Sequence, residues 1–271
     1  MDTVHTMDTT HTIETIEEKV NDLNIDTAAS AATIEGGKPK KKRVVIGLPG
    51  THFSNNFMIS WTQAMFHLWE SGYQVVVSPA TSSFVTFARM KTMGLDVLRG
   101  ADQKPFNGEL DYDVYVTIDS DVVFNPAMLV ELIESTDVHP VVSGYYMMAD
   151  GRNLAVVRDW SESYFVKNGT FQFLTLPDIE NWKTSEATKD EKFMEVNYAG
   201  LGFFACKREV LESLKYPYFY APLQRIPTDE GRTIVDLCSE DVAFTKNIRA
   251  AGYTIQLHTG LRVGHEKSVI L

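Results

Sequence analysis

Hydrophobic residues follow two different periods in the first half of the chain. Runs that are apolar throughout, such as RVVIGLPG, are typical of parallel strands buried on both faces. Apolar residues at helical spacing lie between these runs, as in SNNFMISWTQAMFHLWESG, where Ser54 is placed as N-cap and Gly72 as the stop. The predicted order is a strand at 43–50, a helix at 54–72, a strand at 73–79, a helix at 83–94 and a strand at 114–119.

This alternation predicts an α/β fold of Rossmann-like architecture, with a mostly parallel central sheet flanked by helices. After residue 125 the apolar runs are shorter and separated by turn residues, which predicts a smaller mixed β region. Its predicted strands lie at 141–149, 155–160, 164–174, 196–208 and 253–267, with helices at 208–214 and 239–252.

Residues 1–40 differ from the rest in composition. They are rich in Thr, Asp, Glu and Ala and contain the near-repeat MDTVHT/MDTTHT, so we expect a low-complexity, flexible N-terminal tail with at most a short helix at 13–24. The basic run KPKKKR at 38–43 follows. It is typical of a solvated linker before a first strand, and a nuclear-localisation or polyanion-binding segment is the alternative.

Charge and composition exclude some classes of function. The chain has 25 Lys and Arg against 36 Asp and Glu, a net charge of −11, which disfavours nucleic-acid binding and favours cations. No stretch approaches the roughly 20 apolar residues of a transmembrane segment, and no signal peptide is evident, so we expect a soluble cytoplasmic protein. The two cysteines, Cys206 and Cys238, form no zinc-site spacing, and we expect both in the core.

The strongest chemical signal is a pair of carboxylates in VYVTIDSDVVFNP at 114–126. Asp119 and Asp121 lie one residue apart where a buried strand ends, and two like charges there are unfavourable unless a cation lies between them. The pair therefore predicts a metal site, with a solvated turn as the alternative. Because ligands bind at the carboxyl ends of parallel strands, the loop of Pro49 and Gly50 is expected to share this crevice.

Four segments together resemble one family, the nucleotide-sugar-dependent glycosyltransferases of the GT-A fold. IDSDVVF is similar to their Asp-X-Asp motif, and YAGLGFFACKREVLESL to their Gly-X-Gly strand and the helix after it. SEDVAFTKNIRAAGY resembles their Glu-Asp helix, and LRVGHEK their late metal-binding histidine. The order and spacing match over 43–267. The resemblance implies one GT-A domain at 41–271, with a nucleotide-binding half at 41–124 and an acceptor-binding half at 125–271.

The resemblance also implies a metal and a donor. Asp121 would bind the metal directly, Asp119 would contact the ribose or reach the metal through water, and His265 would complete the ligand set. A hard divalent cation neutralises the charge of a leaving nucleoside diphosphate, and an imidazole ligand favours Mn²⁺ over Mg²⁺. The donor would be a nucleoside-diphosphate sugar and the acceptor a hydroxyl of a glycan or glycoprotein, which makes the protein a hexosyl- or pentosyltransferase.

Catalytic residues follow from the Glu-Asp helix. By resemblance, Asp241 would take the proton from the acceptor hydroxyl in an inverting reaction or orient that hydroxyl in a retaining one, with Glu240 beside it. The alternative is that both carboxylates only cap the helix, where the helix dipole favours them. The sequence leaves the stereochemistry open.

The remaining site residues are also implied by the resemblance. Arg89 and Lys267 would contact the donor diphosphate, and Pro49 would place a loop against the nucleotide base; an exposed helical arginine is the alternative for Arg89. Gly200 and Gly202 would admit the acceptor sugar, or else mark a bulge. His258 is interpreted as structural. Side chains that could stack on sugar faces, or belong to the core, are Trp160, Tyr164, Trp182 and Tyr198.

Two other functions stay open. A phosphatase of the haloacid-dehalogenase type also has Asp-X-Asp after a strand, but there the motif closes the first core strand and Gly-Thr follows it, whereas Val122 and Val123 follow here. A cation-dependent carbohydrate-binding protein without activity would need the metal pair but not Asp241. A Rossmann dehydrogenase is disfavoured because GLPGTHFSN lacks the G-x-G-x-x-G pattern.

Overall fold

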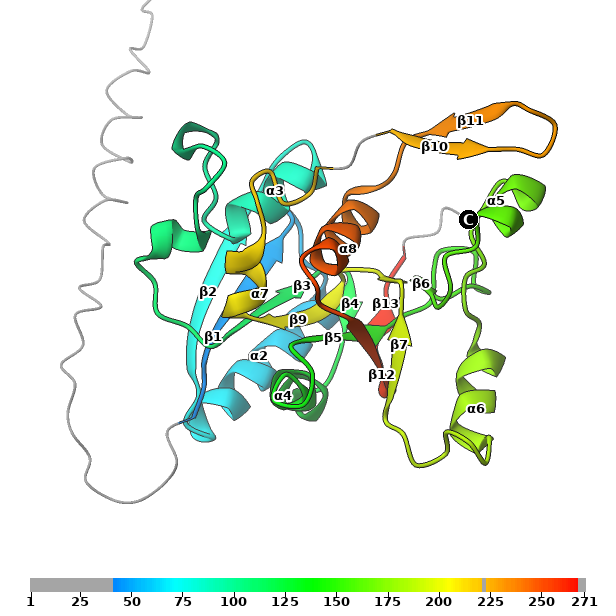
Figure 1. Cartoon of the computed structure of the whole chain (residues 1–271). Helices are drawn as coiled ribbons and strands as arrows, with labels where there is room; N and C mark the ends of the chain where they lie inside the picture. Colours follow the sequence, from blue (N-terminus) through cyan, green and yellow to red (C-terminus); the bar gives the residue numbers. More distant parts are fainter. Residues whose placement is uncertain (1–40, 221–222, 268–271) are drawn as a thin grey trace, which may run out of the picture. The chain divides into compact units, whose positions relative to one another are not determined.

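The computed structural model describes residues 41–220 and 223–267, so the predicted tail and its short helix lie outside the described residues. A seven-stranded sheet forms the centre of the fold, in the order β2-β1-β3-β9-β5-β12-β7 (Figure 1). Its strands are β1 (Arg43–Pro49), β2 (Gln74–Ala80), β3 (Val114–Ile118), β5 (Val141–Tyr145), β7 (Phe193–Val196), β9 (Phe203–Lys207) and β12 (Ile255–Arg262).

The direction of the strands confirms the predicted fold class. β2, β1 and β3 pair in parallel, as do β5 and β12, whereas β9 is antiparallel to both β3 and β5, and β7 is antiparallel to β12. Five of the seven strands therefore run the same way. Three short antiparallel pairs complete the mixed β region, namely β4 (Val122–Val123) with β13 (Gly264–His265), β6 (Val156–Val157) with β8 (Tyr198–Ala199), and β10 (Gln224–Pro227) with β11 (Thr233–Asp236).

Helices cover both faces of the sheet. One face packs against α2 (Asn55–Glu70) and α4 (Pro126–Ser135), and the other against α3 (Val85–Thr92), α7 (Arg208–Ser213) and α8 (Glu240–Ala250). The remaining helical segments are α5 (Glu162–Asn168), α6 (Leu176–Thr184) and the short 3₁₀ helices η1 (Val97–Arg99) and η2 (Pro105–Gly108). None of the helices in the described ranges has the length and apolar content that crossing a bilayer requires.

Alternation along each strand builds two cores. In β1, Val44 and Ile46 point into the core under α2 and α4, whereas Val45 points into the core on the other side. This is why the strand is apolar throughout. Helix α2 begins as predicted, because the Ser54 hydroxyl accepts a hydrogen bond from the backbone N–H of Phe57 at 3.0 Å.

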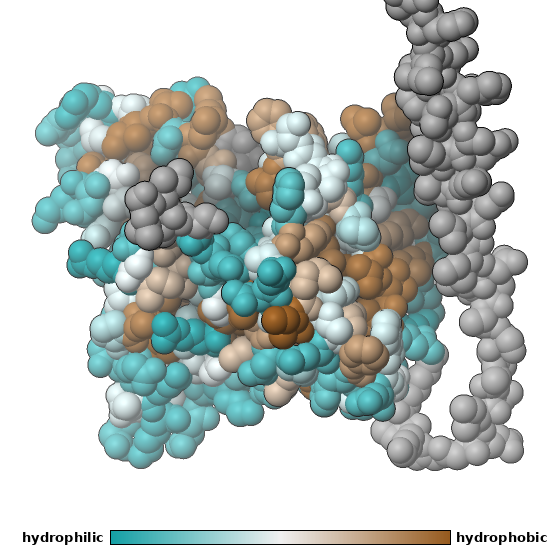
Figure 2. Space-filling view, turned by 180° about the vertical axis from the view of Figure 1, so that it is seen from behind, coloured by the Kyte–Doolittle hydropathy of each residue, from teal (hydrophilic) through white to brown (hydrophobic). Residues whose placement is uncertain are grey.

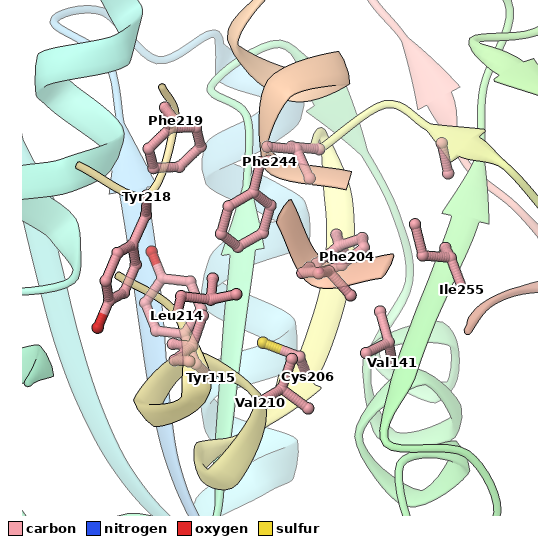
Figure 3. Close-up of a cluster of buried hydrophobic side chains, with 14 of the residues drawn as sticks. Tyr115, Val141, Phe204, Cys206, Val210, Leu214, Tyr218, Phe219, Phe244 and Ile255 are labelled. Carbon is pink, nitrogen blue, oxygen red and sulfur yellow. The ribbon is translucent and has the colours of Figure 1, made fainter. Parts of the chain in front are cut away.

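The core on the face opposite α2 and α4 holds α8 on the sheet (Figure 3). Phe244 of α8 stacks on Phe219 with the ring centroids 4.7 Å apart, and its edge meets Phe204 of β9 at 6.0 Å. All three rings are buried, and burial of each contributes about 1.5–3 kcal/mol. The start of α8, which carries Glu240 and Asp241, is thereby held at a fixed place.

The structure differs from the prediction in the middle of the chain. Residues 164–174 were expected to form a strand, but α5 occupies Glu162–Asn168. Local capping explains this difference, because the Ser161 hydroxyl accepts from the backbone N–H of Tyr164 at 3.2 Å and Gly169, at φ 68°, closes the helix. Helix α6 was not predicted either.

The described residues of the basic run form ion pairs with acidic side chains on the surface of the domain. Lys42 pairs with Asp137 at 2.9 Å and Arg43 pairs with Asp111 and Asp113. The described part of KPKKKR is thus bound to the acidic surface of its own domain.

Figure 2 shows brown, hydrophobic residues reaching the surface in several places among the hydrophilic ones.

Candidate active site

The carboxylate pair lies where the sequence placed it, directly after β3. The backbone N–H of Asp119 donates to the carbonyl of Gly202 at 3.0 Å, which fixes the turn. The loop after β1 approaches the same turn so closely that a Cβ on Gly50 would lie 2.9 Å from the hydroxyl oxygen of Ser120. The Pro49–Gly50 loop and the carboxylates therefore do share one edge of the sheet, although Pro49 itself is buried.

A second group joins Asp121 from the end of the chain. Strand β13 pairs with β4, which places His265 opposite Val122. Nε2 of His265 lies 3.4 Å from Oδ2 of Asp121, and Nζ of Lys267 donates to the same oxygen at 2.6 Å. The backbone N–H of Glu266 donates to the Asp121 carbonyl at 2.8 Å. The short β4–β13 pairing thus brings together residues that are far apart in the sequence.

The orientation of the His265 ring is set by its other nitrogen. Nδ1 lies 2.7 Å from the backbone carbonyl of Met147. Because a carbonyl only accepts, Nδ1 carries a proton, and Nε2 faces the Asp121 carboxylate, whose hydrogen bond favours the protonated imidazolium and raises the pKa of His265. The Tyr146 ring packs on the imidazole with the centroids 4.7 Å apart. Burial favours the neutral acid at Asp121, but hydrogen bonds from His265 and Lys267 outweigh it and lower the pKa of Asp121 to about 2.

Arg89 joins the two carboxylate pairs. Its side chain is buried on α3, so the alternative of an exposed helical arginine is wrong. Nη2 lies 2.9 Å from Oδ1 of Asp119, Nε lies 3.4 Å from Oε1 of Glu240, and Nη1 lies 3.4 Å from the hydroxyl of Thr117. One guanidinium therefore links the end of β3 to the start of α8.

Asp241 faces a different set of partners. The Tyr198 hydroxyl donates to Oδ2 of Asp241 at 2.7 Å, and the Ser239 hydroxyl donates to Oδ1. The backbone N–H of Val242 also donates to Oδ1, at 2.8 Å. All the donors around this carboxylate are neutral, in contrast to the cationic partner of Glu240. Burial and the nearby Asp241 charge raise the pKa of Glu240 above its ordinary value of 4.5.

Tyr146, which the sequence did not reveal, lies near a member of each pair, and burial and the charges of Asp119 and Asp241 raise the pKa of its hydroxyl. Its hydroxyl accepts from the backbone N–H of Gly202 at 3.3 Å. A Cβ on Gly202 would lie 2.8 Å from Cε1 of the same ring, and a Cβ on Gly200 would collide with the hydroxyl. Both glycines are thus needed to admit Tyr146, and their predicted role in acceptor binding stays a prediction. The Gly-X-Gly pattern was the available signal that a bulky side chain approaches here.

Of the three predicted metal ligands, Asp121 and His265 lie side by side, whereas Asp119 pairs with Arg89. Among residues 41–220 and 223–267, no group of three or more His, Cys, Asp or Glu side chains is gathered closely enough to hold a metal ion. The reason is that Asp119 turns to Arg89, while Asp121 and His265 face each other. A carboxylate oxygen and an imidazole nitrogen fit the donor preferences of Mn²⁺, so these two residues would hold the ion and leave its other positions open.

Other residues singled out from the sequence have structural partners. Nε2 of His258 lies 3.0 Å from Glu131, and its Nδ1 accepts from the backbone N–H of Gly260, which confirms the structural interpretation. Trp182 packs under Arg158, 5.0 Å from the ring centroid. Cys206 is buried as predicted, but Cys238 is only half-buried, because it lines a pocket beside α8.

Comparisons with known proteins give distant likenesses only. No protein-family model matches this chain. No curated protein matches it either. Among solved structures, A197 from STIV is similar, with 22% identity and a TM-score of 0.48 over 83% of this chain and 86% of that one.

A second solved structure, GalNAc-T7 with UDP, GalNAc and Mn²⁺, has 12% identity and a TM-score of 0.45 over 86% of this chain. This chain covers only 45% of that one. At these identities and TM-scores neither likeness carries an argument about activity, which therefore rests on the geometry of the site.

Proposed function

We propose that the protein is a metal-dependent glycosyltransferase of the GT-A type, which moves a sugar from a nucleoside diphosphate to a hydroxyl group. One observation carries this proposal. The β4–β13 pairing places Nε2 of His265 3.4 Å from the carboxylate of Asp121, beside a strand end that also holds Asp119. A carboxylate and an oriented imidazole at the end of a parallel strand would form half of a metal site, beside which the diphosphate of the donor would bind.

The divalent cation would supply Lewis-acid stabilisation of the negative charge on the leaving diphosphate. The chain itself supplies the rest of the donor site. Lys267, whose ammonium lies 2.6 Å from Asp121, is placed to move onto a diphosphate oxygen when one binds. Arg89 holds Asp119 at the site through one nitrogen, Nη2, which lies 2.9 and 3.0 Å from the two carboxylate oxygens.

Asp241 is the residue we assign to the acceptor hydroxyl. In the transfer, the acceptor oxygen forms a bond to the anomeric carbon, the bond from that carbon to the diphosphate oxygen breaks, and the hydroxyl proton leaves. The Asp241 carboxylate accepts from hydroxyl groups already, those of Tyr198 and Ser239, and it has no cationic partner among the described residues. Such a carboxylate is free to accept a further hydroxyl proton.

The geometry supports this function over a haloacid-dehalogenase-type phosphatase. In that reaction the first aspartate of the motif would act as the nucleophile. Here both oxygens of Asp119 lie within 3.0 Å of the Arg89 guanidinium, and β3 is not the first strand of the sheet. A carboxylate bound in this way is a poor nucleophile.

Isothermal titration calorimetry with UDP and GDP, each with and without Mn²⁺, tests the donor site. We expect one nucleotide to bind only with Mn²⁺, and Asp121→Ala to weaken that binding by at least about 10–100-fold, since it removes a ligand of the ion. Asp159→Asn, at a side chain that is 88% exposed, is the matched control and should bind like wild type. If neither nucleotide binds in any condition, the proposed function is wrong.

A further inference from the structure

A pocket of about 320 Å³ lies directly beside Asp241, formed by the segment around α5, the start of β10, the end of β11 and the start of α8. Five of the fifteen residues that line it are aromatic. The rings that line it are Trp160, Phe165, Phe171, Phe173 and Tyr198.

The pocket and the catalytic carboxylate share two residues. Tyr198 lines the pocket with its ring and donates its hydroxyl to Asp241 at 2.7 Å. Ser239 lines the pocket as well, and its hydroxyl donates to the other oxygen of Asp241. A molecule held in the pocket therefore lies one side chain away from the carboxylate that we assign to the acceptor.

The aromatic wall is held in place without a ligand. Phe171 packs on Trp160 at 3.8 Å and on Phe165 at 4.7 Å between ring centroids. Nζ of Lys246 lies 4.7 Å above the Trp160 ring and donates to the side-chain oxygen of Gln224 at 3.2 Å. A wall that is ordered before binding loses little entropy when a ring packs against it.

We propose that this pocket binds one pyranose ring of an uncharged carbohydrate acceptor and presents its hydroxyl to Asp241; this inference rests on the proposed function. A pyranose has an apolar face of C–H groups, which packs on aromatic side chains, and a rim of hydroxyls. Polar groups for that rim are present in Thr170, Gln224 and Asp236.

Size and charge favour a single uncharged ring as the occupant. Ligand pockets usually enclose about 300–1,000 Å³, so this pocket is at the small end and takes one ring at a time. None of the residues that line it is Lys or Arg, and Asp236 is the charged one among them. The ammonium of Lys246, which contacts two of the lining residues, is already engaged by the Trp160 ring and the Gln224 oxygen, so the lining favours an uncharged ring.

Cys238 offers a native probe of this pocket. Its thiol lines the pocket and is half-buried, whereas Cys206, the other cysteine of the chain, is fully buried. Alkylation of the full-length protein by iodoacetamide should therefore modify Cys238 first, and mass spectrometry of the peptides gives its rate. We expect the methyl glycosides of glucose, galactose, mannose or N-acetylglucosamine to slow this rate at least about threefold for the preferred ring, because the bound ring covers the thiol.

Two matched variants separate binding in the pocket from unspecific protection. Trp160→Ala should abolish the protection, whereas Trp69→Ala, at an exposed tryptophan of α2, should keep it. If Trp160→Ala does not fold, as judged by circular dichroism, protection of the wild-type protein decides alone. Protection by p-cresol or hexanol but by no glycoside would overturn the proposal in favour of an apolar group.

The test is independent of the donor site. If UDP or GDP binds with Mn²⁺ and no glycoside protects Cys238, the acceptor inference is wrong and the proposed function stands. If a glycoside protects Cys238 and no nucleotide binds, the pocket is a carbohydrate site but the transferase assignment fails.

Discussion

The site contains two pairs of neighbouring carboxylates, and the members of each pair are used differently. At the end of β3, Asp119 turns to Arg89, while Asp121 faces His265 and Lys267. At the start of α8, Glu240 turns to the same arginine, while the donors to Asp241 within residues 41–220 and 223–267 are neutral. In each pair, one carboxylate is therefore held by the Arg89 guanidinium and the other has partners of its own.

This difference shows how a fold can keep four acidic groups close together. Two carboxylates share one buried guanidinium, which offsets their desolvation and joins two elements that come from different halves of the chain. The other two carboxylates are satisfied separately, Asp121 by Lys267 and His265 and Asp241 by neutral donors. The comparison predicts a structural role for Asp119 and Glu240, and it leaves Asp121 and Asp241 for the proposed chemistry.

The largest expected effect is on turnover. Asp241→Asn keeps the shape of the side chain but removes its basicity, so we expect the rate of sugar transfer to fall by about 10²–10⁴-fold while Mn²⁺-dependent nucleotide binding is unchanged. The rate is measured by nucleotide release at saturating donor. Glu240→Gln is the control, and it should lower the rate less. The reverse order would contradict the comparison.

The next effect is on stability. Arg89→Met leaves the carboxylates of Asp119 and Glu240 partly buried without a cation, so we expect the free energy of unfolding to fall by about 3 kcal/mol. Urea unfolding measures this. The triple variant that also carries Asp119→Asn and Glu240→Gln should recover part of the loss, and a triple variant no more stable than Arg89→Met would show that the pairing contributes little.

A smaller effect on stability is expected from the close packing of Tyr146 against Gly200 and Gly202. Gly200→Ala would place a methyl group against the Tyr146 hydroxyl, so we expect a loss of about 1–3 kcal/mol in the free energy of unfolding. Tyr146→Phe removes that hydroxyl and should relieve part of the loss. In a double-mutant cycle the two changes should therefore couple favourably, whereas simple additivity would exclude the contact.

The smallest expected effect is a pH dependence at Glu240. Burial and the Asp241 charge raise the pKa of Glu240 in the folded state, so the folded protein binds this proton more tightly than the unfolded chain does. Its ionisation therefore lowers stability as the pH rises above the ordinary carboxyl pKa of 4.5. Glu240→Gln should be slightly more stable than wild type near pH 7 and equal to it near pH 4. A variant that is less stable at pH 7 would mean that the Arg89 pairing dominates.

Local patterns predicted much of the fold but not the partners of the site residues. The apolar run of β1 and the Ser54 cap of α2 are encoded within a few residues, and both are present as expected. The sequence did not reveal that Asp119 turns to Arg89, because that contact depends on how α3 packs on the sheet. Tyr146 was missed for the same reason, since only the close approach of Gly200 and Gly202 identifies it.

At residues 164–174, the prediction failed within the local sequence itself. Its aromatic and β-branched residues favour a strand, but the Ser161 cap and the Gly169 stop make a short helix the better local solution. That error matters for function, because the aromatic residues that follow α5 line the pocket beside Asp241.

The position of β9 has a consequence for biosynthesis. This strand lies between β3 and β5, both of which leave the ribosome long before it. Until β9 emerges, the facing edges of β3 and β5 have no partner, and the two would have to be kept from pairing with each other or with another chain. Folding should therefore be slow and late, and Asp121 and His265, the residues proposed to hold the metal, come together only when β13 pairs with β4.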